Sequence, residues 1–266
     1  MTDDGRRVAV VTGGTGAIGE AIARGIAQDL KYEVILVCRN ASKAERACSN
    51  ISAVTGNPRV RYEVVDLSRR SSIQSLGERW LGPLHVLVNN AADTPRARQL
   101  TNDGLEVQFA TNIMGYFWMI QELTDVLARY SPSRVVNVAS YWAGGLDLDD
   151  LQFERRRYNN DDAYRQSKQA DRMLTVAIAE QLRSRGIAVN ACHPGDVKSA
   201  LSNSLGFGGH QSPDEAAATP VWLATDSEGQ HHSGRYFENQ RVQSCQFSVD
   251  REAVEALYQT CRGFAS

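Results

Sequence analysis

One stretch near the start of the chain decides the fold: Arg7-Val8-Ala9-Val10-Val11-Thr12-Gly13-Gly14-Thr15-Gly16-Ala17-Ile18-Gly19. Its first six residues form a short run rich in β-branched side chains, which predicts a buried strand. Glycines follow at once, and a helical pattern then runs from Glu20 to Leu30. A strand, a glycine-rich turn and a helix in this order give the turn a structural context that isolated glycines lack.

The glycines of this turn, Gly13, Gly16 and Gly19, are spaced differently from the commoner G-x-G-x-x-G pattern. Glycine permits a tight turn and lets the backbone approach a pyrophosphate, while the helix N-terminus supplies unpaired N–H groups and a favourable dipole. The turn therefore predicts a dinucleotide site. The alternative is a turn that is merely flexible.

The next predicted strand, residues 33–38, ends at Arg39-Asn40. NAD sites usually have an acidic residue about 20 positions beyond the glycines, where it binds the ribose 2′-OH. Arg39 stands there instead, and a guanidinium suits a 2′-phosphate that no carboxylate at this strand end would repel. The sequence therefore favours NADP(H) over NAD(H). The alternative is that Arg39 is an exposed arginine at a strand end and has no part in cofactor binding.

A second pattern lies in Tyr164-Arg165-Gln166-Ser167-Lys168, with Ser140 upstream. On a helix, Tyr164 and Lys168 would lie on one face, one turn apart. An ammonium beside a phenol lowers the phenol pKa, which is ordinarily about 10, so Tyr164 would exchange a proton near neutral pH. By itself the spacing also occurs on ordinary solvated helices, and it gains weight from the glycine-rich turn.

Strand and helix signals alternate along the chain, which indicates right-handed βαβ crossovers and a parallel sheet with helices on both faces. We predict a single Rossmann-type, doubly wound α/β domain over residues 1–266 with a mostly parallel seven-stranded sheet. Residues 1–140 would form its cofactor half and residues 140–266 its catalytic and substrate half. The predicted strands are residues 8–12, 34–38, 60–65, 86–89, 134–139, 188–192 and 235–237. The predicted helices are residues 16–30, 42–55, 71–80, 105–130, 163–185 and 213–225.

With these residues in view, the chain resembles the short-chain dehydrogenase/reductase family over nearly its whole length. The resemblance rests on Thr12 to Gly19, Val65-Asp66-Leu67, Asn89-Asn90-Ala91-Ala92, Asn112, Ser140, Tyr164 with Lys168, and His193-Pro194-Gly195. The segments Val135 to Ser140, Ala163 to Lys168, Ala191 to Gly195 and Thr219 to Ala224 resemble its retinol-dehydrogenase-like group. The chain departs from the family at Ala92, where a glycine is usual, and at Ser199, where a threonine is usual.

The resemblance implies four catalytic residues. Tyr164 would be the general acid, Lys168 would lower its pKa and hold the nicotinamide ribose, Ser140 would bind the substrate carbonyl, and Asn112 would support a proton relay. It also implies a set of cofactor-binding residues: Gly13, Thr15, Gly16, Ala17, Ile18, Gly19, Arg39, Asn40, Asp66, Leu67, Asn89, Ala91, Tyr164, Lys168, Pro194, Gly195, Val197 and Ser199.

The expected function is NADP(H)-dependent hydride transfer to or from a carbonyl or alcohol of a hydrophobic substrate. Reduction of a conjugated C=C bond and a non-catalytic NADP(H)-binding regulatory protein stay open as alternatives. Trp142, Phe153, Leu205 and Phe207 would line an apolar substrate pocket, although ordinary packing is an alternative for each. Residues 200–210 read as a glycine-hinged lid.

Composition excludes several other classes of function. The formal charge of −2 gives no argument for nucleic acid, and no stretch is apolar enough to span a bilayer. Five scattered cysteines indicate neither zinc nor a disulfide framework and suit a reducing cytoplasm, and no motif predicts a metal. Met1 to Gly5 show no secretory signal. Residues 105–130 and 163–185 carry apolar positions on more than one face, which in this family suggests a homodimer or homotetramer; packing within one chain is the alternative.

Overall fold

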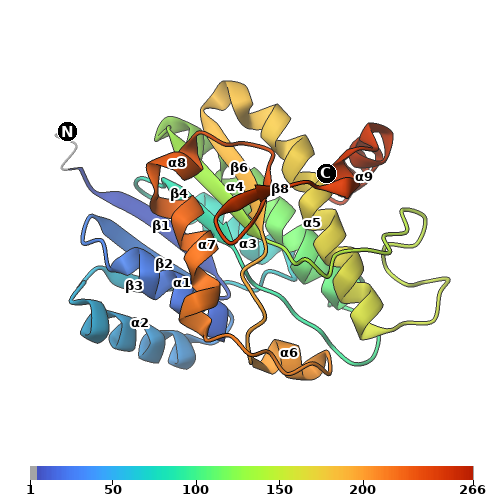
Figure 1. Cartoon of the computed structure of the whole chain (residues 1–266), viewed down its shortest axis with the longest axis horizontal. Helices are drawn as coiled ribbons and strands as arrows, with labels where there is room; N and C mark the ends of the chain where they lie inside the picture. Colours follow the sequence, from blue (N-terminus) through green and yellow to red (C-terminus); the bar gives the residue numbers. More distant parts are fainter. Residues whose placement is uncertain (1–4, 266) are drawn as a thin grey trace.

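An eight-stranded sheet runs through the computed structural model, which describes residues 5–265 (Figure 1). Residues 1–4, on which part of the expectation about a secretory signal falls, lie outside the described residues, as does Ser266. The strand order is β3-β2-β1-β4-β5-β6-β7-β8, and all neighbours are parallel except β7 and β8. The strands are β1 (Arg7–Thr12), β2 (Tyr32–Cys38), β3 (Val60–Val64), β4 (Val86–Asn89), β5 (Ser133–Val138), β6 (Ile187–Cys192), β7 (Tyr236–Glu238) and β8 (Arg241–Gln243).

The doubly wound, mostly parallel sheet is confirmed, but the predicted count of seven strands is wrong by one. The eighth strand, β8, has only three residues, all of them exposed, so it has no apolar pattern to mark it. It pairs antiparallel with β7 through a turn in which Asn239 and Gln240 both have positive φ. Neither residue is glycine, which is why the turn did not stand out in the sequence.

Helices cover both faces of the sheet, because alternate residues along each strand point to opposite sides. Val8 and Val10 of β1 pack in the core under α3, α4, α5 and α9, whereas Ala9 and Val11 pack under α1, α2 and α7. The helices are α1 (Ala17–Ala27), α2 (Ala41–Thr55), α3 (Arg70–Arg79), α4 (Gly115–Arg129), α5 (Asn160–Leu182), α6 (Ala200–Ser204), α7 (Pro213–Thr225), α8 (Ser227–Gln230) and α9 (Arg251–Gly263). Short 3₁₀ turns, Arg183–Arg185 and Gln246–Ser248, complete the helical segments.

The predicted helix over residues 105–130 is interrupted near its start. Phe109–Met114 form a π-helix, and α4 begins only at Gly115. Such wide turns are rare and often occur at functional sites. Asn112 lies in this turn, fully buried.

The C-terminal helix α9 packs against α5, as Figure 1 shows for the red helix beside the yellow one. Val254, Leu257 and Cys261 form its buried stripe, while Tyr258 meets Phe117 of α4 edge-on with ring centroids 5.7 Å apart. Apolar surface of α4 and α5 is therefore covered within the chain. Packing within one chain was the alternative to a homodimer or homotetramer interface on these helices.

Candidate active site

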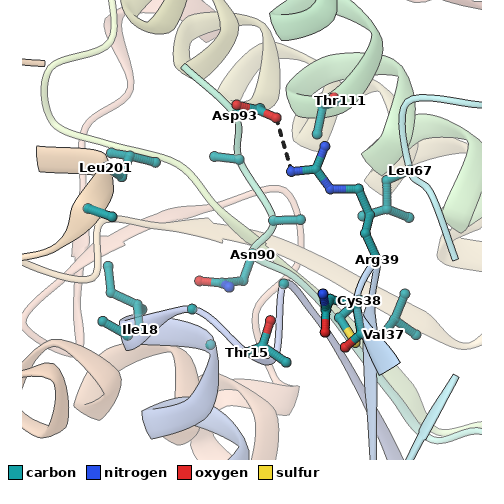
Figure 2. Close-up of a pocket in the computed structure, with 18 of the residues that line it drawn as sticks. Thr15, Ile18, Val37, Cys38, Arg39, Leu67, Asn90, Asp93, Thr111 and Leu201 are labelled. Atoms are coloured by element: carbon teal, nitrogen blue, oxygen red, sulfur yellow. Dashed lines mark hydrogen bonds and ion pairs between the residues drawn. The ribbon is translucent and has the colours of Figure 1, made fainter. Parts of the chain in front are cut away.

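The strand order reverses between β1 and β4, and parallel sheets bind ligands in the crevice at the carboxyl ends of such strands. A cleft of about 580 Å³ lies there (Figure 2). The predicted cofactor residues that line it are Gly13, Thr15, Gly16, Ala17, Ile18, Gly19, Arg39, Asn40, Asp66, Leu67, Ala91 and Ser199. Segments far apart in the sequence, including the start of α6, thus share one cavity.

Two glycines of the first turn are required by their surroundings. Gly13 has φ +65°, and a Cβ there would lie 2.8 Å from the Cα of Ala91. At Gly19 a Cβ would lie 2.2 Å from the carbonyl oxygen of Gly13. The turn is therefore wound tightly against the end of β4, and it leaves the start of α1 open to the cleft. This is the cradle that a pyrophosphate needs.

The asparagine that lines the cleft is Asn90 rather than Asn89, and the cofactor role expected for Asn89 stays a prediction. Asn89 is fully buried and faces Asn137 of the neighbouring strand β5, to whose Oδ1 its side-chain nitrogen donates at 3.0 Å. Asn90 lines the cleft, and its side chain donates to the carbonyl of Thr12 at 2.9 Å. The Thr12 hydroxyl in turn accepts from the backbone N–H groups of Asn90 and Ala91.

Positive charge gathers at the end of the cleft where β2 finishes. Arg39 lines this end together with Lys43, whose backbone N–H donates to the side chain of the N-cap residue Asn40 at 2.9 Å. The Arg39 guanidinium also forms an ion pair with Asp93, at 3.2 Å, shown as the dashed line in Figure 2. The strand end itself has no carboxylate, as expected, but the loop after β4 brings one to Arg39.

The remaining predicted cofactor residues do not line this cleft. Tyr164 and Lys168 are buried in α5, while Pro194, Gly195 and Val197 belong to the loop after β6. In that loop Val197 pairs with Gln211 in an isolated bridge, so its backbone is already held by the chain. The cofactor roles of these five residues stay predictions.

Ser140, Tyr164 and Lys168 are brought together, as the sequence predicted. Ser140 follows β5 and lies close enough to Tyr164 to lower the pKa of its phenol. The helix that carries Tyr164 begins at its N-cap Asn159, which accepts from the N–H groups of Asp161 and Asp162. Acidic residues in the first turn suit the helix dipole, and the cap places Tyr164 at the start of the second turn.

The pKa of Tyr164 differs from the expectation, which had the lysine lowering it. Burial raises the pKa of the phenol well above its ordinary value of 10, the hydrogen bond with Ser140 lowers it, and the Asp171 carboxylate raises it further. The Lys168 ammonium lies 5.9 Å from the centroid of the Tyr164 ring and makes its ion pair with Asp171 instead, at 2.8 Å. Spacing along a helix placed the lysine near the tyrosine but did not identify the lysine's partner.

Asn112 holds the loop after β4 against the helical layer. Its side-chain oxygen accepts from the N–H of Asp93 at 2.8 Å, and its nitrogen donates to the Asp93 carbonyl at 3.1 Å and to the Ser167 hydroxyl at 3.3 Å. These bonds tie the cofactor cleft to the helix that bears Tyr164. The proton-relay role expected for Asn112 stays a prediction.

The four predicted substrate residues separate into two groups. Trp142 and Phe207 meet edge-on with ring centroids 4.5 Å apart, so the segment after Ser140 touches the segment after α6. Phe153 and Leu205 are buried, and Phe153 packs under the Arg156 guanidinium. A second cleft of about 480 Å³ beside Trp142 is more polar than expected, being lined by Tyr141, Trp142, Ala143, Asn159, Asp161, Asp162 and Arg165.

The loop between Ser140 and Tyr164 is organised by one carboxylate that the sequence did not single out. Burial alone would raise the pKa of Asp150, but backbone N–H groups of Arg156, Glu154 and Arg155 and the Arg156 side chain hold it at about 2. This stabilisation is present above the ordinary pKa of an aspartate and is lost as pH falls through about 2.

Asp150→Ala is expected to lower the free energy of unfolding at pH 7 by about 2–3 kcal/mol, because three backbone donors and a guanidinium lose their acceptor. Thermal unfolding at pH 7 measures it, with the exposed Asp103→Ala as the control. Equal melting temperatures for both variants would contradict the capping role.

Several residues of the cleft were missed in the sequence: Lys43, Asn90, Asp93, Thr94, Thr111 and Leu201. Lys43 had a usable signal, because it lies one helical turn beyond Arg39-Asn40 at a helix start. Asp93 and Thr94 had none, since they come from a loop whose path depends on Asn112.

The fold and the cleft define a nucleotide-binding α/β protein with a Ser-Tyr-Lys group at the carboxyl edge of its sheet. A family profile described as short chain dehydrogenase matches residues 7–206. The chain belongs to the short-chain dehydrogenase family, and it is an oxidoreductase of the kind that acts on an alcohol or carbonyl group. Within the family it falls in the retinol-dehydrogenase-like group.

Known proteins similar to this chain include enzymes and solved structures. Mouse retinol dehydrogenase 13 is 33% identical over 268 residues, which cover 93% of this chain and 80% of that protein. An uncharacterised protein from Mycobacterium paratuberculosis has a TM-score of 0.80 at 26% identity, covering 97% of this chain and 92% of the other. A Pseudomonas aeruginosa RhlG/NADP active-site complex has a TM-score of 0.69 at 25% identity, covering 89% and 97%.

Residues 5–265 also show no feature of a membrane span or a metal site. No helix in that range is long and apolar enough to cross a membrane. Nor do those residues contain a group of three or more histidine, cysteine or acidic side chains able to hold a metal ion. The cysteines Cys38, Cys48, Cys192, Cys245 and Cys261 are all free thiols.

Proposed function

We propose that this protein is an NADP(H)-dependent reductase of a carbonyl group on a substrate with an apolar portion. The observation that carries the proposal is that Ser140 and Tyr164, both buried, lie close together at the carboxyl edge of the sheet that also holds the nucleotide cleft. It places a hydroxyl donor and a proton donor together. The cofactor half, with β1 to β5, and the catalytic half would act as one domain.

The residues of the cleft fit a dinucleotide phosphate. The Gly13–Gly19 turn leaves no room for side chains where it packs against the end of β4, and Arg39 and Lys43 offer positive charge at the far end. The similar RhlG structure is described with NADP. When bound, NADPH supplies the hydride, and the protein contributes orientation and a proton.

In this proposal Ser140 donates a hydrogen bond to the substrate carbonyl oxygen and Tyr164 gives that oxygen its proton. Because burial raises the pKa of the Tyr164 phenol, the residue carries its proton at neutral pH and has it available for the carbonyl oxygen. Trp142 and Phe207 would flank the apolar part of the substrate. The polar second cleft would receive a hydroxyl or similar group.

The test is cofactor oxidation by the purified protein. NADPH and NADH are each offered with a panel of hydrophobic aldehydes, ketones and enones, the enones addressing reduction of a C=C bond. Turnover with NADPH and a carbonyl compound is expected. NADPH binding with no turnover of any panel member would favour the non-catalytic reading, and turnover of enones alone would favour C=C reduction.

Cofactor preference is expected to move in opposite directions in two variants. Arg39→Asp removes the cation and introduces a carboxylate, so the ratio of kcat/KM for NADPH over NADH should fall at least about 100-fold. Asp93→Asn frees Arg39 from its 3.2 Å ion pair, so the same ratio should rise by a few fold, a small effect because the Arg39 side chain is 64% exposed. An unchanged ratio in Arg39→Asp would mean that another residue reads the 2′-phosphate.

The proposal also places the protein in the cytoplasm and makes it a homodimer or homotetramer. Five free thiols, four of them buried, favour a reducing compartment such as the cytoplasm. Because α9 packs on α5 within the chain, a homodimer or homotetramer would form on a surface that α9 leaves uncovered. Light scattering on the purified protein measures the mass directly.

A further inference from the structure

Lys168 is enclosed by acceptors from its own chain. Its side-chain nitrogen donates to Asp171 Oδ2 at 2.8 Å and to the carbonyl of Val138 at 3.0 Å, and it reaches the Tyr116 hydroxyl at 3.5 Å. Lys168 and Asp171 are each only 2% exposed. An ammonium this deeply buried is costly unless a counter-charge lies beside it.

Asp171 lies one turn beyond Lys168 on α5 and is only half satisfied. Its Oδ2 takes the ammonium, while its Oδ1 is buried with no hydrogen-bond partner among the described residues. A buried carboxylate in this condition is costly, and apolar residues of similar volume often stabilise a protein better than a buried ion pair does. Stability therefore does not explain why a carboxylate stands at this place.

We propose that Asp171 is a positioning residue of the active site, one that holds the Lys168 amine in place, keeps it protonated and keeps the Tyr164 phenol in its acid form. The inference rests on the proposed function, because that proposal assigns the proton donor to Tyr164. Asp171 would not touch the substrate. It would act through the charge and position of Lys168.

The negative charge of Asp171 determines in which direction its removal changes proton loss from Lys168 and Tyr164. The titratable groups around the pair come from four elements: Lys168 and Tyr164 on α5 itself, Tyr116 on α4, Cys192 on β6 and Cys261 on α9. Asp196 and Tyr141 also face Tyr164. Asp171 supplies the negative charge next to Lys168, and removing it makes loss of a proton easier for Lys168 and Tyr164 alike.

The first variant is Asp171→Asn, which keeps an oxygen for the Lys168 amine and removes the charge. The pH profile of kcat/KM for carbonyl reduction is expected to move to lower pH by about one unit. Affinity for NADPH, measured by its fluorescence, should stay within about twofold. Glu180→Gln, which removes a charge from the exposed end of the same helix, is the matched control and should leave the profile unchanged.

A second measurement needs no cofactor and no turnover. In Asp171→Asn the buried Lys168 ammonium loses its counter-charge, which destabilises the charged amine in the folded state but not in the unfolded state, so stability should rise with pH. The melting temperature should be about 5 °C below that of the wild type at pH 7, and the gap should narrow toward pH 10. Asp171→Leu, which also removes the hydrogen bond, should in addition weaken NADPH binding.

The outcomes separate this inference from the proposed function. If the wild-type protein has no turnover, the proposed function fails, and the melting curves still decide whether Asp171 keeps Lys168 charged. If turnover occurs but Asp171→Asn leaves the pH profile in place, the positioning role is overturned. A melting gap that is constant from pH 7 to pH 10 would also overturn it, because a purely structural contact has that signature.

Discussion

Replacing Tyr164 with phenylalanine is expected to lower kcat for NADPH oxidation by about 10³-fold or more. The substitution removes the proposed proton donor, and the contribution of such a donor is typically about 10²–10⁴-fold. The ring remains to fill its buried place on α5, so the fold should persist. Affinity for NADPH should change by no more than about twofold, since Tyr164 does not line the nucleotide cleft.

The measurement pairs steady-state kinetics with NADPH fluorescence titration. Tyr130→Phe is the matched control, because Tyr130 packs on His85 beside the start of β4, at the opposite edge of the sheet from the cleft. It should retain full turnover. If Tyr164→Phe kept more than a tenth of the wild-type kcat, the proton would have another source and the proposed mechanism would be wrong.

Lys168→Met is expected to reduce both turnover and stability. It removes a charge that the family resemblance implies beside the nicotinamide ribose, so kcat/KM should fall about 10²-fold or more and the Kd for NADPH should rise. It also leaves the Asp171 carboxylate buried without its cation. Breaking one partner of a buried pair costs about 3–5 kcal/mol of the free energy of unfolding.

The double variant Lys168→Met with Asp171→Leu separates the two effects. Removing both charges and keeping apolar volume should recover most of the lost stability, whereas turnover should stay low. Urea unfolding and NADPH kinetics measure the two quantities, with Lys31→Met at the surface as the control. Recovery of turnover in the double variant would mean that Lys168 acts only by neutralising Asp171.

The sequence by itself determined the architecture and the identity of the central chemical groups. Alternating strand and helix periods require a parallel sheet, because a strand followed by a helix can return to the sheet only through a crossover. Gly13 and Gly19 predicted the turn at the end of β1. The four-residue spacing of Tyr164 and Lys168 predicted that they lie on one face of a helix. These are local properties, carried by residues close together in the chain.

Among the elements that were not predicted, β8 has a weak local signal and α9 has a clear one. The strand β8 is three exposed residues long, and the turn before it uses Asn239 and Gln240 rather than glycine. The helix α9 has a clear stripe at Val254, Leu257 and Cys261, yet only its packing on α5 shows what that stripe is for. A helix's apolar face indicates burial without naming the surface that buries it.

Only the tertiary structure decided which polar groups meet. Asp93 reaches Arg39 because Asn112 holds its loop, and Lys168 pairs with Asp171 while Tyr164 keeps a raised pKa. The side chain of Asn90 lines the cleft, whereas that of Asn89 is buried against Asn137. Partner choice and pKa depend on burial and on distances between segments far apart in the chain, and a short-range pattern contains neither.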